Sequence, residues 1–152
     1  MNSRNFRLLV LNPGSTSTKI AVFDNDKELK KSTVKHPPEE IQNFKSIWDQ
    51  YDYRKRKILD WVRENNFKLD EIDAVVSRGG TINSVPSGIY LINSKMLEDM
   101  KSGRYGKHAC NVGCQINYDL GKELNIPSIT VDPPVTNELM EIATYTGLPQ
   151  IR

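Results

Sequence analysis

The sequence predicts an α/β domain with a mixed sheet and helices on its faces. Two apolar, β-rich runs, Phe6–Leu11 and Thr18–Phe23, are joined by the turn residues Asn12-Pro13-Gly14, which is typical of a hairpin. Further along, short apolar runs alternate with stretches whose apolar residues recur at helical spacing. A chain of 152 residues with 38% hydrophobic content is long enough for one domain with a full core. Alternating strands and helices after opening hairpins are typical of a mixed sheet.

The composition excludes several classes of protein. A formal net charge of +2 is too small to indicate a nucleic-acid partner. No apolar run is long enough to span a bilayer, and the polar start at residues 1–5 has no signal-peptide core behind it. Cys110 and Cys114 lie four residues apart in one predicted helix and form neither a disulfide framework nor a four-ligand zinc site. We therefore expect a reduced, cytoplasmic protein without nucleic-acid or membrane partners.

In the first half of the chain, three strands precede one long helix. The third strand, Glu28–Val34, is expected at the sheet edge because its lysines suit an exposed rim. The helix is expected to begin at Pro38 and to end at Asn65-Asn66. One apolar stripe runs along it: Ile41, Phe44, Trp48, Tyr51, Ile58 and Val62. The basic run Arg54–Lys57 has acidic neighbours, which favours a solvated helix face over a nucleic-acid site.

The second half contains three expected strands and three expected helices. The strands are Ile72–Val76, of the buried kind, Ile89–Ile92 and Ser128–Asp132. The first helix is capped by Asn93-Ser94, the second runs from Ala109 to Leu124, and the third runs from Asn137 to Tyr145 and ends at Gly147. Pro149 follows this last glycine.

The stretch from Asn12 to Lys19 contains the chemistry that a phosphate group requires. Gly14 is expected to adopt the positive φ that lets successive amides converge on an anion. The four residues from Ser15 to Thr18 supply hydroxyl donors, and Lys19 supplies a point charge. Strand alternation places Ser17 and Lys19 on the same side. A polar hairpin turn explains this stretch equally well by itself, and the spacing of a Walker loop is absent.

Arg78 is the second candidate site residue, and it follows a buried strand directly. Ligands bind at the carboxyl ends of such strands, where an arginine can grip a carboxylate or phosphate with two hydrogen bonds. Gly79 and Gly80 are expected to let a substrate approach the backbone; the alternative for Arg78 is a partly exposed ion pair. His108 begins a helix and Asp132 ends a strand, so each alone fits a helix-start or turn residue. Together these features lie at element ends, where one edge of a sheet presents its functional groups.

Four ordered motifs are similar to those of the acetate kinase family, within the sugar kinase, Hsp70 and actin superfamily. They are Asn12-Pro13-Gly14-Ser15-Thr16-Ser17-Thr18-Lys19, Ser77-Arg78-Gly79-Gly80, Lys107-His108-Ala109-Cys110-Asn111 and Val131-Asp132-Pro133. The resemblance extends from about residue 6 to residue 152. Pro13 and the pattern Pro86-x-Gly88-x-Tyr90 resemble the butyrate kinase branch more than the acetate kinase branch.

This resemblance implies a ribonuclease H-like (actin-like ATPase) domain: a five-stranded mixed sheet flanked on both faces by helices, with a small insertion near residues 78–106. It implies reversible transfer of the ATP γ-phosphate to butyrate or another short- or branched-chain carboxylate, with ATP/ADP and Mg²⁺ as cofactors. Residues 1–152 would be the N-terminal acid- and phosphate-binding domain, without the C-terminal nucleotide-binding domain and inactive alone. The full-length parent would be a homo-oligomer.

The resemblance also implies roles for individual residues. Those near the phosphates are Asn12, Gly14, Ser15, Thr16, Ser17 and Lys19, with Asn12 holding magnesium through water. Arg78, Gly79 and Gly80 would contact the substrate, and Arg78, His108 and Asp132 would lie at the reacting centre. A carboxylate substrate is already ionised and needs no general base, so we expect Asp132 to orient Arg78 or the metal-bound water. Two alternatives stay open: an acetate kinase, and a non-catalytic phosphate- or nucleotide-binding module.

Overall fold

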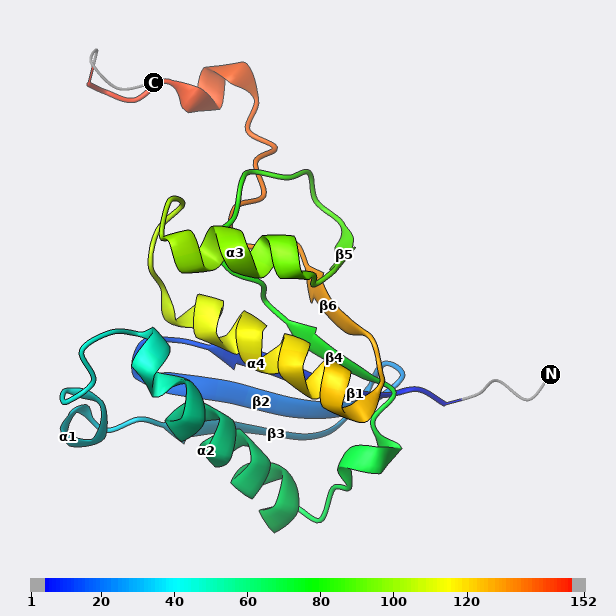
Figure 1. Cartoon of the computed structure of the whole chain (residues 1–152). Helices are drawn as coiled ribbons and strands as arrows, with labels where there is room; N and C mark the ends of the chain where they lie inside the picture. The colour runs from blue at the N-terminus through cyan, green and yellow to red at the C-terminus, as the bar shows by residue number, and fades with distance from the viewer. Residues whose placement is uncertain (1–4, 149–152) are drawn as a thin grey trace.

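The structure, a computed structural model, describes residues 5–148 and contains one six-stranded mixed sheet (Figure 1). The strands follow the order β3-β2-β1-β4-β6-β5 across it. Their bounds are β1 Arg7–Pro13, β2 Ser17–Asp24, β3 Lys27–Lys35, β4 Ala74–Ser77, β5 Ile89–Leu91 and β6 Ser128–Val131. β1, β4 and β6 are parallel to one another, and the other neighbouring strands pair antiparallel. Two parallel strand ends, those of β1 and β4, therefore meet near the centre of the sheet.

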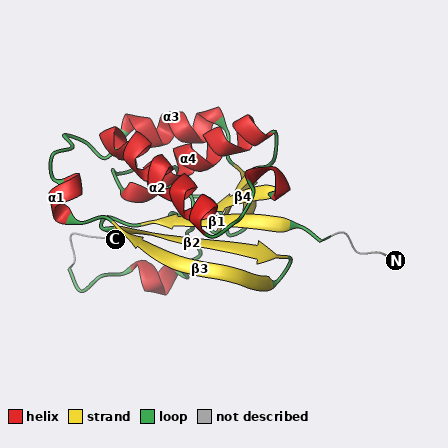
Figure 2. Ribbon diagram, turned by 90° about the horizontal axis from the view of Figure 1, so that it is seen from below, coloured by secondary structure: helices red, strands yellow, loops and turns green. Residues whose placement is uncertain are grey.

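The helices α2, α3 and α4 lie on the same side of this sheet (Figure 2). The α-helices are α1 Pro38–Ile41, α2 Tyr51–Glu64, α3 Ser94–Ser102 and α4 Ala109–Leu124. Three short 3-10 helices are η1 Trp48–Gln50, η2 Leu69–Glu71 and η3 Glu141–Thr144. Across residues 5–148, no helix is both long and apolar enough to cross a bilayer.

The main core lies between the sheet and the helices α2 and α4. Alternate residues of the central strands are fully buried toward the helices, as the period of two in a strand requires. The cluster combines Leu9, Leu11, Ile20, Val22 and Val75 from the sheet with Ile58, Val62, Val112, Ile116 and Leu120 from the two helices. Each such side chain contributes about 1.5–3 kcal/mol by burial, so this layer fixes where the strand ends lie.

The sheet confirms the expected fold class and corrects two details. The edge position of β3 is confirmed. The sheet has six strands where five were expected, because β5 pairs antiparallel with β6, with Tyr90 opposite Thr130. The expectation of helices on both faces is wrong for the α-helices of the described chain, since α2, α3 and α4 share one side (Figure 2).

The single long helix from Pro38 is also wrong, because the chain leaves the helix after four residues. α1 ends at Ile41 and carries no buried side chain, so little packing holds it. A new helical start follows at Ser46 and Asp49, where each backbone N–H donates to the other residue's side chain, at 2.8 and 3.3 Å. This reciprocal arrangement is that of a capping box, and its Ser-x-x-acid spacing is visible in the sequence.

The expected helix Asn137–Tyr145 is wrong as well. Only the 3-10 turn η3 forms there, and none of its residues is buried. Leu139, Met140 and Ile142 are 64–75% exposed, so no packed apolar face supports a longer helix. Gly147 lies in this exposed segment, and Pro149 lies outside the described residues.

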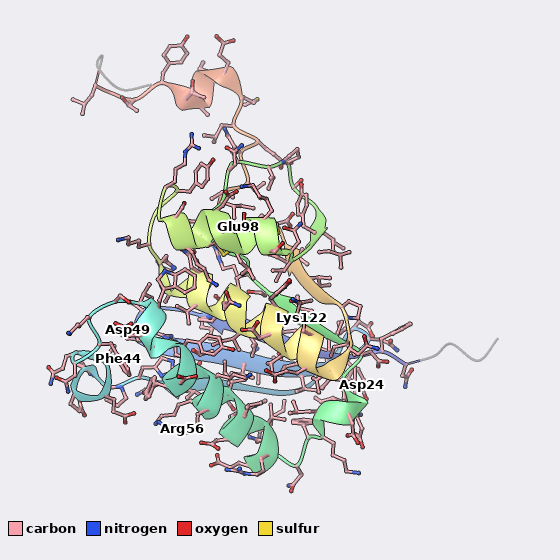
Figure 3. The ribbon with its side chains drawn as sticks, in the orientation of Figure 1. Asp24, Phe44, Asp49, Arg56, Glu98 and Lys122 are labelled. Atoms are coloured by element: carbon pink, nitrogen blue, oxygen red, sulfur yellow. The ribbon has the colours of Figure 1, made fainter. Side chains whose placement is uncertain are left out.

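The basic run on α2 is a solvated face only in part. Arg56 is exposed on the outer side of the helix, as expected (Figure 3). Arg54, in contrast, is completely buried. Arg54 points under the turn that joins β1 and β2, and its contacts are described below.

Candidate functional site

Three of the candidate site segments meet in one pocket of about 440 Å³. β1 and β4 are parallel neighbours, with Leu11 opposite Ser77, so the residues that follow each position emerge at the same edge of the sheet. The N-terminus of α4 lies beside them. The lining residues are Asn12, Pro13, Gly14, Arg78, Thr81, His108, Cys110 and Pro134. The structure therefore brings the Asn12 turn, Arg78 and His108 together.

The turn between β1 and β2, residues 13–17, forms what we call the phosphate loop. The Gly14 N–H donates to the Ser17 carbonyl at 2.7 Å, and the His36 N–H donates to the Thr16 carbonyl at 2.8 Å. The expected positive φ at Gly14 is wrong: the left-handed glycines are Gly79, Gly88, Gly103 and Gly106. The loop is shaped by its hydrogen bonds rather than by a glycine conformation.

The polar side chains of this loop are uncommitted. Within residues 5–148, no hydrogen bond or ion pair occupies the side chains of Asn12, Ser15, Thr16, Ser17 or Lys19. Lys19 is exposed and its neighbour Thr18 is buried, so alternation along β2 puts Ser17 and Lys19 on the side away from the helices.

Arg78 is exposed and its guanidinium has no hydrogen bond or ion pair within the described chain. The alternative of a structural ion pair therefore finds no partner there. Gly79 and Gly80 are both buried, and their expected role in substrate approach stays a prediction. A Cβ on Gly79, whose φ is +82°, would lie 2.5 Å from Thr130 Oγ1, and one on Gly80 would lie 2.5 Å from Met100 Sδ. These glycines let the chain pack closely behind Arg78.

His108 is the N-cap of α4. Its Nδ1 accepts a hydrogen bond from the Cys110 N–H at 3.2 Å and lies 3.1 Å from the Cys110 thiol. A ring nitrogen that accepts carries no proton, so the proton of the neutral ring is on Nε2. That second nitrogen is consequently available to donate into the pocket. Burial raises the pKa of the Cys110 thiol, so the thiol is protonated at neutral pH.

Asp132 lies outside the lining of this pocket. Its Oδ1 accepts from the Gly88 N–H at 2.8 Å, and its own N–H donates to the Gly88 carbonyl at 3.0 Å. Its φ is +43°, a conformation that this pair of bonds supports. Within the described residues no hydrogen bond or ion pair joins Asp132 to Arg78, so the expected orientation of Arg78 by Asp132 stays a prediction.

Two supporting residues were missed from the sequence. Asn111 is fully buried, and its Oδ1 accepts from the Thr81 N–H at 2.9 Å, which ties the chain after Arg78 to α4. Gly113 packs directly against the ring of Pro13, with no room for a Cβ. The sequence shows that Gly113 is a small residue of α4 but does not show its partner, because Pro13 lies 100 residues earlier.

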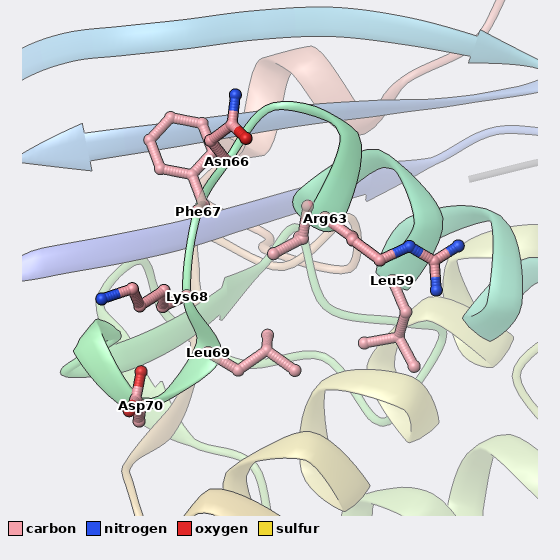
Figure 4. A pocket seen from close by; sticks show the side chains of 8 residues that line it. Leu59, Arg63, Asn66, Phe67, Lys68, Leu69 and Asp70 are labelled. Carbon is pink, nitrogen blue, oxygen red and sulfur yellow. The ribbon is translucent and has the colours of Figure 1, made fainter.

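A second pocket, of about 580 Å³, lies between the C-terminal end of α2 and the segment that follows it (Figure 4). Its apolar lining comes from Leu59, Val62, Phe67 and Leu69, with Arg63, Asn66, Lys68 and Asp70 around it. It contains none of the candidate site residues. The chemistry is concentrated at the first pocket.

Comparison with known proteins supports the resemblance seen in the motifs. No family model matches the chain. Over 146 residues, 96% of the chain, it is 47% identical to a probable butyrate kinase of Clostridium botulinum and 45% identical to butyrate kinase 1 of Clostridium acetobutylicum. The chain spans 41% of the length of each of these relatives. An acetate kinase from Porphyromonas gingivalis has the same fold over 95% of the chain and 41% of its own, with a TM-score of 0.55 at 15% identity.

Proposed function

We propose that this chain, a homologue of the butyrate kinases, forms the carboxylate- and phosphate-binding part of an ATP-dependent carboxylate kinase. The observation that carries the proposal is the set of uncommitted polar groups at one pocket. Within the described residues, no hydrogen-bond or ion-pair partner binds the guanidinium of Arg78, the Nε2–H of His108, or the side chains of Asn12 and the phosphate loop. Because these groups gather at one pocket and have no partner in the described chain, they are free to bind an anionic ligand there.

The chemistry of acyl phosphate formation matches these residue types. A short carboxylic acid, with a pKa of about 4–5, is ionised at neutral pH and attacks without a general base. The obstacle is repulsion between an anionic nucleophile and an anionic phosphoryl group. Arg78 can bind two oxygens at once, Lys19 adds a positive charge, and His108 Nε2–H can donate to an oxygen that gains charge.

The described residues fit magnesium only as an ion held mainly by the nucleotide. Within residues 5–148 there is no cluster of three or more His, Cys, Asp or Glu side chains that could bind a metal. Magnesium commonly keeps several waters and the substrate phosphates as ligands. When bound with ATP it neutralises phosphate charge, and the uncommitted Asn12 amide is the group we assign to its water shell. We also propose a cytoplasmic location, since both cysteines are free.

The test is acyl-hydroxamate formation from butyrate, isobutyrate and acetate, with ATP and Mg²⁺, by the complete protein that contains this chain. We expect Arg78→Ala to reduce turnover at least about 100-fold, the size of effect seen when one charge-stabilising donor is removed. Arg104→Ala is the matched control, because Arg104 is also exposed but stacks near Tyr105 outside the pocket; its activity should stay within about twofold.

Three results would contradict parts of the proposal. Activity of Arg78→Ala within about threefold of the wild type would remove Arg78 from the reacting centre. A clear preference for acetate would overturn the substrate class. Binding of ATP without turnover of any of the three acids would favour a non-catalytic module.

A further inference from the structure

Arg54 connects helix α2 to the phosphate loop from beneath. Its side chain is 0% exposed. Nη1 donates to the Gly14 carbonyl at 2.9 Å and Nη2 donates to the Ser15 carbonyl at 2.8 Å, while Nε donates to Gln50 Oε1 at 2.9 Å. One guanidinium therefore fixes two successive peptide groups of the loop.

The direction of these two carbonyls fixes the direction of two amides. In a trans peptide the C=O and the following N–H point in opposite directions. Since the Gly14 and Ser15 carbonyls point at Arg54, the N–H groups of Ser15 and Thr16 point away from it. Neither N–H donates to a partner within residues 5–148. Two adjacent free N–H groups on one side of a turn form an anion-binding concavity.

The charge of Arg54 favours an anion at the same place. None of its hydrogen-bond partners is a carboxylate, and it takes part in no ion pair of the described chain. Burial lowers the pKa of its guanidinium. An arginine side chain nevertheless stays protonated in proteins, so the charge remains. A buried charge without a counter-ion is unfavourable, and an anion on the far side of the loop would offset part of that cost.

A chain of hydrogen bonds holds the same turn from its second side. Arg54 Nη1 also lies 3.4 Å from Thr18 Oγ1, which is 2.8 Å from His36 Nε2, and His36 Nδ1 is 3.3 Å from the Tyr53 hydroxyl. Tyr53 donates to Glu40 at 2.8 Å. Because a carboxylate only accepts, Tyr53 accepts from His36 Nδ1–H, and His36 Nε2 accepts from Thr18. The network thus has a single orientation, with His36 neutral.

We infer that Arg54 is a positioning residue for the phosphate loop: by holding the Gly14 and Ser15 carbonyls it turns the Ser15 and Thr16 N–H groups toward a bound phosphate. The inference rests on the proposed function and adds to it a residue that never touches the substrate. Helix α2, through Arg54, sets the geometry of the anion site. Its charge is part of the attraction for the phosphate.

The test uses the 152-residue chain, with inorganic phosphate and Mg-ATP as probes. Amide resonances of Ser15 and Thr16 are followed by NMR in the wild type, in Arg54→Met, in Arg54→Lys and in Arg56→Met. Arg56 lies two residues further along α2 and is exposed, so it is the matched control. We expect Arg54→Met to shift both loop resonances, speed their hydrogen exchange and weaken phosphate binding at least tenfold. Arg54→Lys should restore only part of the affinity, because an ammonium cannot hold both carbonyls.

A second variant separates charge from folding, in case Arg54→Met does not fold. Gln50→Glu places a carboxylate where Gln50 Oε1 lies 2.9 Å from Arg54 Nε, so the hydrogen bond survives while the charge is neutralised. We expect its phosphate affinity to fall at least fivefold with the thermal unfolding midpoint preserved. Unchanged affinity in Gln50→Glu would overturn the role of the charge.

The remaining outcomes also decide the question. Unchanged Ser15 and Thr16 resonances and exchange in both Arg54 variants would overturn the positioning role, even if stability fell. If the wild-type chain binds neither probe, the proposed function fails for this chain. The loop resonances of the Arg54 variants still test the positioning role in that case.

Discussion

Acid should destabilise this protein through His36, the histidine behind the phosphate loop. Burial, together with the nearby charges of Arg54 and Lys57, lowers the pKa of His36 from 6.5 to about 4. The side chain is 1% exposed and bonded on both nitrogens, so the folded state keeps it neutral. The unfolded chain takes up a proton near pH 6.5, whereas the folded chain does so only near pH 4. The stabilising contribution is therefore complete above pH 6.5 and is lost as the pH falls toward 4.

The size of the loss follows from the two pKa values. One pKa unit corresponds to about 1.4 kcal/mol, so the folded state should lose about 2 kcal/mol by pH 5 and about 3 kcal/mol by pH 4. For a chain of this size, about 2 kcal/mol lowers the unfolding midpoint by roughly 4–8 °C. The assay is thermal or urea unfolding at pH 7.5, 6, 5 and 4.5.

Carboxylates also titrate near the lower end of this pH range. The effect of His36 is therefore measured as the difference in pH dependence of stability between the wild type and a His36 variant. His36→Gln keeps an acceptor and donor but cannot become charged; it should be less stable at pH 7.5 and should have a shallower pH dependence. Equal slopes for the wild type and His36→Gln between pH 7 and 5 would refute the reasoning, because no buried neutral histidine would then be present.

Two further predictions concern the packing around the site. Gly79→Ala should lower the free energy of unfolding by about 2–4 kcal/mol, since φ is +82° and the new Cβ would clash with Thr130. Urea titration measures this loss. Gly147 has open space around it, so the control Gly147→Ala should change the free energy of unfolding by less than about 0.5 kcal/mol. Burial raises the pKa of the Cys114 thiol to about 12, and both cysteines are buried. A disulfide reagent at pH 8 should therefore modify Cys110 and Cys114 far more slowly in the folded protein than in guanidinium. Rapid modification of both thiols in native buffer would contradict the buried positions.

The sequence was most informative where a signal and its partner lie close together. Helix α4 has the expected bounds, Ala109–Leu124, because its apolar row and its N-cap both lie within the segment. Asn93 caps α3 as expected, accepting from the Met96 N–H at 3.0 Å. The break between α1 and α2 was also local, at Ser46 and Asp49, but the apolar stripe that continues across it concealed the break.

The features that the sequence did not predict depend on partners that lie far along the chain. Arg54 has the sequence context of a solvated helix face, and the carbonyls that bury it lie 39 and 40 residues earlier. Its spacing, three residues after Tyr51 and four before Ile58, places it on the apolar stripe, unlike Arg56, but the segment does not show what its guanidinium binds. The packing role of Gly79 and Gly80 was likewise not predicted, because the atoms that exclude a side chain, those of Thr130, Pro133, Met100 and Asn111, lie far along the chain. Residue type indicated that small residues were needed there, and only the fold shows why.

The same contacts bear on the two interpretations of the loop that were equally favoured from its sequence. A turn that is only a connection has no need of a buried cation beneath it, yet Arg54 is held there without a carboxylate partner in the described chain. The interior contacts use the backbone carbonyls and Thr18, which leaves Ser15, Thr16, Ser17 and Lys19 free on the outer side. A positive charge behind, free N–H groups in front and an arginine across the pocket together favour a bound anion. A polar turn alone accounts for the solvated groups on the outer side but not for the buried cation behind them, so the phosphate interpretation accounts for more of these contacts.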